Sequence, residues 1–105
     1  MPDAVDAYDK LVKTLAKEAD VTAGQMFGKA CLKVHGKAFI AQHRETVVFK
    51  LNGDSHSKAM GLPGSVLWDP SGKGRPMKEW VALGADQSKH FSALAKAALK
   101  YVGEN

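Results

Sequence analysis

The chain has 105 residues, which is enough for one domain and too few for two. Its hydrophobic content of 45% excludes an intrinsically disordered chain, and its net charge of +4 is weaker than a dedicated nucleic-acid binder requires. The single cysteine, Cys31, excludes an internal disulfide and a zinc site built from cysteine pairs.

The N-terminal segment 3–19 is predicted to form an amphipathic helix. Its apolar residues recur at three- and four-residue steps and form one stripe: Val5, Tyr8, Val12, Leu15 and Ala19. Asp3 precedes the segment, and its carboxylate can cap the first helical turn.

Three strands are expected in the next region. Residues 30–34 alternate in polarity, and Gly36 favours a tight turn into a second strand through Phe39 and Ile40. The β-branched and aromatic segment 46–51 is typical of a third strand. This pattern predicts an antiparallel meander.

The second half of the chain is expected to begin with a short helix at 54–60. Strands at 65–68 and 77–83 follow, and a helix at 87–102 is predicted to be capped by Asp86. The order α-β-β-β-α-β-β-α predicts an α+β two-layer domain, with a five-stranded antiparallel sheet and helices on one face. The outer helices are expected to bury Tyr8, Leu15, Phe91 and Leu94 against Leu32, Phe39 and Phe49.

Two separated segments resemble a known family. "MFGKACLKVHGKAF" at 26–39 and "WDPSGKGRPMKEWV" at 68–81 are similar, in order and spacing, to two segments of the TfoX N-terminal domain family. The resemblance covers roughly residues 5 to 102 and departs from the family at Lys29, where a second glycine is common. It implies a single bacterial α+β domain over 1–105 in a regulatory setting, with no catalytic residue to carry over.

The segment 69–80, "DPSGKGRPMKEW", raises the question of anion binding. It lacks the P-loop pattern and connects two predicted strands, so a hairpin connection is expected. The alternative is a loop whose backbone amides, with Lys73, Arg75 and Lys78, bind an anion or, weakly, nucleic acid.

Positive charge is concentrated in the predicted sheet. Nine Lys or Arg and four Asp or Glu lie between residues 25 and 80. Lys29, Lys33, Lys37, Arg44, Lys73 and Arg75 are therefore candidates for one basic patch on the outer face, although such lysines also keep a sheet solvated. Trp80 is a candidate contact beside the basic loop if it is exposed, and a core residue if it is not.

Cys31 and the histidines are the remaining candidates for chemistry. Cys31 shares a strand face with Lys29 and Lys33, which could lower its thiol pKa, but a lone cysteine is also a common small core residue. The four histidines, His35, His43, His56 and His90, lack metal-site spacing and are expected in solvent-exposed positions.

These observations predict a non-catalytic regulatory or protein-interaction module with an unidentified protein partner. A homodimer through an open sheet face is plausible, because two-layer domains leave one face uncovered. The alternatives are anion or nucleic-acid binding through 71–78, and a thiol enzyme or redox sensor using Cys31. No cofactor or metal is expected. Without a signal-peptide pattern or a membrane-spanning apolar run, a cytoplasmic protein that does not enter membranes is expected.

Overall fold

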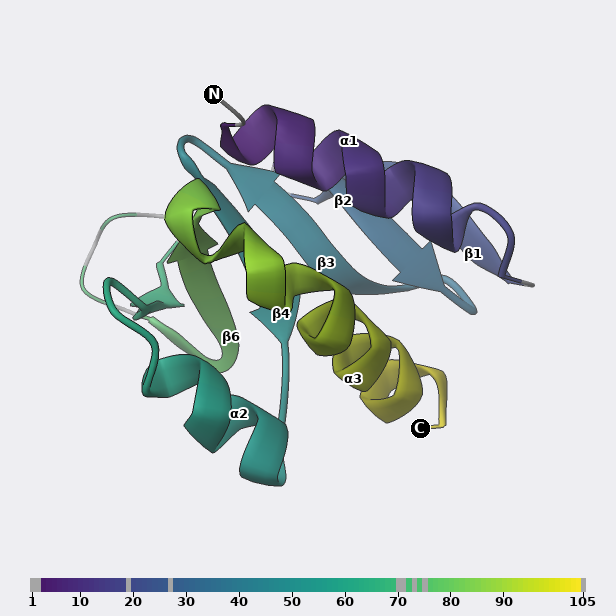
Figure 1. The fold of residues 1–105 in the computed structure, drawn as a ribbon. Helices are drawn as coiled ribbons and strands as arrows, with labels where there is room; N and C mark the ends of the chain where they lie inside the picture. The colour runs from purple at the N-terminus through teal and green to yellow at the C-terminus, as the bar shows by residue number, and fades with distance from the viewer. Residues whose placement is uncertain are drawn as a thin grey trace.

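A computed structural model of the chain describes residues 3–18, 20–26, 28–69, 72, 74 and 76–104. The elements follow one another as α1 (Ala4–Leu15), β1 (Val21–Met26), β2 (Lys29–Val34), β3 (Lys37–His43), β4 (Thr46–Lys50), α2 (Gly53–Met60), β5 (Val66–Trp68), β6 (Met77–Gly84), the 3₁₀ helix η1 (Ala85–His90) and α3 (Phe91–Gly103) (Figure 1). Within the described ranges, no helix has the length and hydrophobicity needed to cross a membrane.

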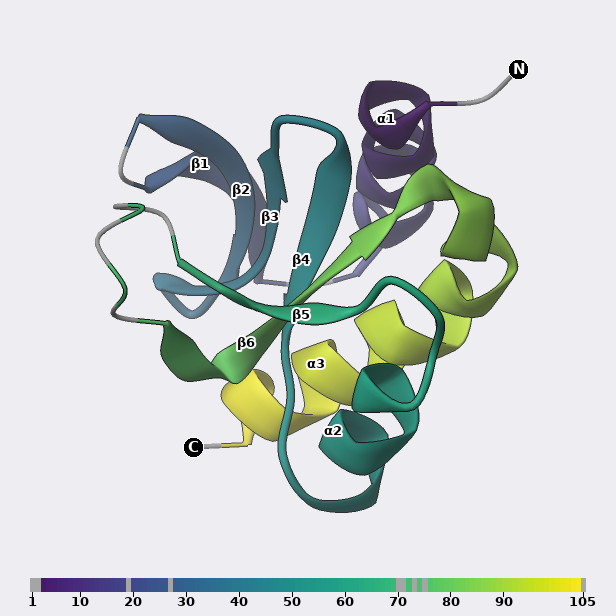
Figure 2. The same ribbon diagram turned by 90° about the vertical axis from the view of Figure 1, so that its left-hand side faces the viewer.

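The strands form one antiparallel sheet in the order β1-β2-β3-β4-β6-β5. The α+β class is confirmed, but the sheet has six strands where five were predicted. The additional strand is β1, whose sequence VTAGQM contains alanine and glycine, which are weak strand formers. Its pairing with β2, a tertiary interaction, is what makes it a strand. The helices lie on one face of the sheet (Figures 1 and 2).

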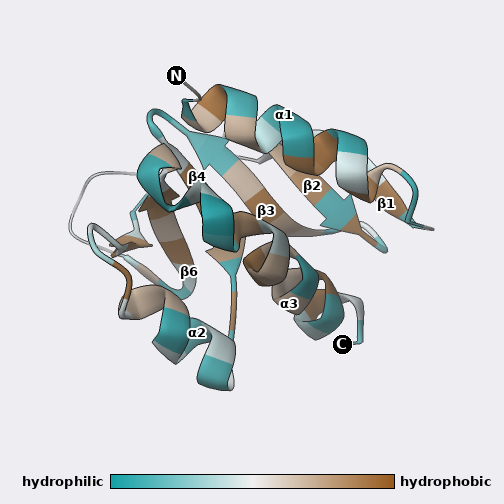
Figure 3. Ribbon diagram, in the orientation of Figure 1, coloured by the Kyte–Doolittle hydropathy of each residue, from teal (hydrophilic) through white to brown (hydrophobic). Residues whose placement is uncertain are grey.

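Helix α1 begins where the sequence predicts and ends earlier. The Asp3 carboxylate accepts a hydrogen bond from the backbone N–H of Asp6 at 2.9 Å, which caps the first turn. The buried side of α1 consists of Ala4, Ala7, Tyr8, Leu11 and Leu15. Val5 is 49% exposed, so the predicted stripe was wrong at that position. Figure 3 shows the alternating hydrophilic and hydrophobic bands of this half-buried helix.

The main core lies between the helices and the sheet. It contains all seven residues predicted for it, namely Tyr8, Leu15, Leu32, Phe39, Phe49, Phe91 and Leu94. The rings of Phe49 on β4 and Phe91 on α3 lie 5.2 Å apart between centroids, in a tilted arrangement. Aromatic contact of this kind adds to the stabilisation that burial provides. Helix α3 is thereby fixed to the centre of the sheet.

The C-terminal helix begins later than predicted. The 3₁₀ helix η1 takes the place of its first turns, and Gln87 inside η1 has non-helical angles, φ −100° and ψ 16°. The Asp86 carboxylate accepts a hydrogen bond from the Gln87 side-chain amide at 3.3 Å and does not cap the helix. The chain thus turns at Gln87 before α3 starts at Phe91.

Candidate functional site

The sheet face away from the helices, called the outer face below, carries a second apolar cluster. Its buried members are Cys31, Ala41, Val48, Trp68, Trp80 and Ala82. Four of them form one row across the strands, because Cys31 pairs with Ala41, Ala41 with Val48, and Val48 with Ala82. The indole rings of Trp68 and Trp80 belong to the same cluster, with their centroids 5.4 Å apart. The expectation of an open outer face is therefore wrong where this cluster lies.

Trp80, one of the candidate contact residues, is buried in the structure. Only 6% of its surface is exposed, because it packs against Trp68 on β5. A side chain that is buried in the folded protein cannot contact a partner without local opening. Trp80 is therefore a core residue of the outer cluster, and the expectation that it could be an exposed contact beside the basic loop is wrong.

A partly buried hydrogen bond joins β3 to β5 on the outer face. The indole N–H of Trp68 donates to Nδ1 of His43 at 2.7 Å, and the two rings meet edge to face. Nδ1 must be unprotonated to accept this bond, so the neutral imidazole carries its proton on Nε2. Burial, together with the nearby charges of Lys29 and Arg44, lowers the pKa of His43 below its ordinary value.

The thiol of Cys31 lies inside the same cluster and is 0% exposed. Burial raises the pKa of Cys31 above its ordinary value, and the charge of Lys33 opposes this increase only in part. The thiol is therefore protonated at neutral pH, where a nucleophilic cysteine would be a thiolate. This environment favours the packing interpretation over the thiol-enzyme one.

The unfolding dependence of Cys31 alkylation checks this assignment. We expect iodoacetamide at pH 7 to modify the native protein at a rate set by the unfolded population, and to modify the urea-unfolded protein rapidly. Intact-mass measurement over time follows both reactions. Fast, stoichiometric modification of the native protein would restore Cys31 as a candidate reactive group.

The carboxylate of Asp69 occupies backbone amides that were candidates for binding an anion. The Asp69 side chain accepts hydrogen bonds from the backbone N–H of Gly72 at 3.0 Å and of Gly74 at 2.9 Å. Both glycines have positive φ, 67° and 77°, which turns their amides toward this carboxylate. These amides are already satisfied, which favours the hairpin connection over an anion-binding loop. Lys73 and Arg75 lie outside the described residues, so nucleic-acid binding through 71–78 stays a prediction.

The other basic candidates are spread over the sheet: Lys37 begins β3 and Arg44 lies between β3 and β4, apart from those on β2 and β6. Lys29 and Lys33 share the outer side of β2, on either side of buried Cys31. Lys78 is exposed on β6, and its carbonyl accepts a hydrogen bond from His56 Nε2 at 2.7 Å. Since β3 and β4 separate β2 from β6 in the sheet, the structure groups Lys29 with Lys33 but not with Lys78. In the described part of the chain, no three potential metal ligands form a group.

The edge strand β1 is the feature of this region that the sequence did not reveal. Among the described residues it pairs with β2 alone, so its other edge faces away from the sheet. The Asp20 carbonyl accepts a hydrogen bond from the His35 amide at 3.2 Å. This bond determines which residues of β1 direct their backbone groups toward β2. By alternation, the N–H and C=O groups of Val21, Ala23 and Gln25 point away from β2.

The side chain of Lys33 lies across this edge strand. A Cβ placed on Gly24 would lie 3.3 Å from Cε and 3.6 Å from Nζ of Lys33. Because Gly24 has no side chain, the lysine stem can rest on it and hold its ammonium group over β1. The free edge of β1 and the charges of Lys29 and Lys33 together form the candidate site, called the β1 edge site below.

Comparison with known proteins adds no relative to this description: no family model, no curated protein and no solved structure matches the chain.

Proposed function

We propose that this protein is a non-catalytic interaction module that binds an extended, acidic segment of a partner protein along β1. The observation that carries the proposal is the outward row of hydrogen-bonding groups at Val21, Ala23 and Gln25. Such a row accepts an additional strand, and main-chain hydrogen bonds supply the affinity. The proposal is consistent with the regulatory setting implied by the resemblance of 26–39 and 68–81 to the TfoX N-terminal domain family.

The composition of β1 supports this function. Edge strands that must stay unpaired usually carry charged residues, proline or a bulge. The six residues of β1 contain no charge and no proline, and their register with β2 is continuous. The positive charges beside β1, on Lys29 and Lys33, favour a partner strand with acidic side chains on its outer face.

A peptide pair of opposite charge tests the proposal. In the peptide EVTVEVE, all three acidic residues lie on one face of the strand, and KVTVKVK has the same pattern with basic residues. We expect saturable binding of EVTVEVE, weaker binding of KVTVKVK, and a several-fold loss of EVTVEVE affinity in Lys33→Gln. Equal affinity for both peptides, or an unchanged affinity in Lys33→Gln, would contradict the charge preference.

Proline at Ala23 separates strand addition from simple attraction of charge. The Ala23 N–H points away from β2, so Ala23→Pro removes an outward donor without removing a β1–β2 bond. We expect this variant to fold and to lose EVTVEVE binding, while the control Ala23→Ser keeps it. A second copy of the chain is the other possible occupant of this edge, and sedimentation equilibrium tests for it. A dimer that Ala23→Pro abolishes would assign the edge to that second copy.

A further inference from the structure

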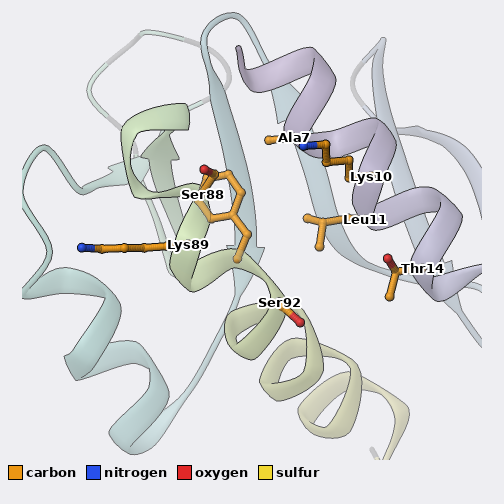
Figure 4. A pocket seen from close by; sticks show the side chains of 8 residues that line it. Ala7, Lys10, Leu11, Thr14, Ser88, Lys89 and Ser92 are labelled. Atoms are coloured by element: carbon orange, nitrogen blue, oxygen red, sulfur yellow. The ribbon is translucent and has the colours of Figure 1, made fainter. Parts of the chain in front are cut away.

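A groove lies on the helical side of the protein, away from the β1 edge site. Helix α1 and the segment formed by η1 and the start of α3 enclose a hollow of about 300 Å³. From α1 it is lined by Ala7, Lys10, Leu11 and Thr14. Figure 4 shows Ala7 and Leu11 directed from α1 toward the η1–α3 side. The volume is at the lower end of the range for small-molecule sites.

The floor of this groove is apolar. Leu11 and Phe91 line it although they are only 6% and 2% exposed, so it reaches the surface of the main core. Phe91 is held from below by Phe49. An alkyl chain or a single aromatic ring placed here would exchange water for contact with a rigid apolar surface.

The rim of the groove is positive and rich in hydroxyl groups. Lys10 and Lys89 lie at opposite sides, together with Thr14, Ser88 and Ser92, and none of the described lining residues carries a carboxylate. Lys10 forms no ion pair with Asp6, one helical turn earlier, and among the residues placed in the structure neither lysine has an acidic partner. In Figure 4 Lys10 points across the groove, whereas Lys89 extends toward α2.

We infer that this groove binds a small amphiphilic anion, such as a medium-chain carboxylic acid. The apolar chain lies on Leu11 and Phe91, and the carboxylate is bound by the Lys10 ammonium and the rim hydroxyls. Lys89 adds to the positive potential that attracts the anion. An apolar floor with a few polar groups at the rim is the usual construction of such sites. The inference does not depend on strand addition at β1.

Three ligands with the same alkyl chain test the inference. Octanoate, 1-octanol and octylamine are titrated into ¹⁵N-labelled protein, and amide shifts are followed at Leu11, Phe91 and Ser92. We expect saturable shifts at low-millimolar octanoate, weaker binding of octanol and the weakest binding of octylamine. Identical affinities for the three ligands, or no shifts at these residues, would overturn the inference.

Two charge-removing variants make the test specific. Lys10→Gln is expected to weaken octanoate binding by about threefold to fivefold and to leave octanol binding unchanged. Lys96→Gln is the matched control, because it removes one exposed charge from α3 at a residue that does not line the groove. Equal losses in both variants would show that octanoate responds only to net charge, and would also overturn the inference.

Discussion

Replacing Trp80 by alanine is expected to lower the free energy of unfolding by about 3–5 kcal/mol. Trp80 is 6% exposed, and its ring packs against Trp68 in the outer cluster. The truncation removes one of the two indoles of this pair and leaves a cavity beside Trp68. Since small domains are stable by only about 5–15 kcal/mol, this loss is a large fraction of the total.

Urea unfolding of wild type and Trp80→Ala measures this effect. Val66→Ala is the control, because Val66 lies on the adjacent strand β5 and is 56% exposed, so its truncation should change stability by less than about 0.5 kcal/mol. A loss in Trp80→Ala as small as that of the control would mean that Trp80 is exposed in solution. It would then return as a candidate surface contact.

The second large effect is a loss of stability in mild acid, caused by His43. The pKa of His43 is lowered in the folded protein, whereas in the unfolded chain it is about 6.5. The unfolded state therefore binds the proton first as the pH falls. The stabilisation from neutral His43 is complete above the unfolded pKa and is lost as the pH falls through the folded pKa.

The hydrogen bond from Trp68 explains why this protonation is costly. A proton on Nδ1 of His43 would occupy the lone pair that accepts the Trp68 indole N–H and place two donors opposite each other. We expect His43→Gln to flatten the decline in stability below about pH 6.5. His90→Gln should keep the decline, since His90 does not accept the Trp68 bond. An unchanged pH profile in His43→Gln, measured by urea unfolding, would refute this role.

The features predicted correctly from the sequence are local ones. The cap at Asp3 depends on residues within one turn, and the turn at Gly36, with φ 78°, depends on a residue that tolerates this conformation. The strand at 46–50 follows from its own β-branched and aromatic residues. Such elements need little information from elsewhere in the chain.

The features missed by the sequence depend on distant partners. Strand β1 has few strand-forming residues and exists through its pairing with β2. The Trp68–His43 bond joins residues 25 positions apart, and the burial of Trp80 depends on where β5 lies. The contact of Lys33 with Gly24 required the register of two strands, of which one was not predicted. The sequence positions of Gly24 and Lys33 alone do not indicate this contact.

Hydrogen exchange of the β1 amides tests the proposed edge site most directly. In the free protein, the amides of Thr22 and Gly24 should exchange slowly, because they face β2, while those of Val21, Ala23 and Gln25 should exchange rapidly. Saturating EVTVEVE should protect these three outward amides and leave the alternation otherwise unchanged. If the peptide binds while all three outward amides still exchange as in the free protein, it does not add a strand to β1 and the proposed function is wrong.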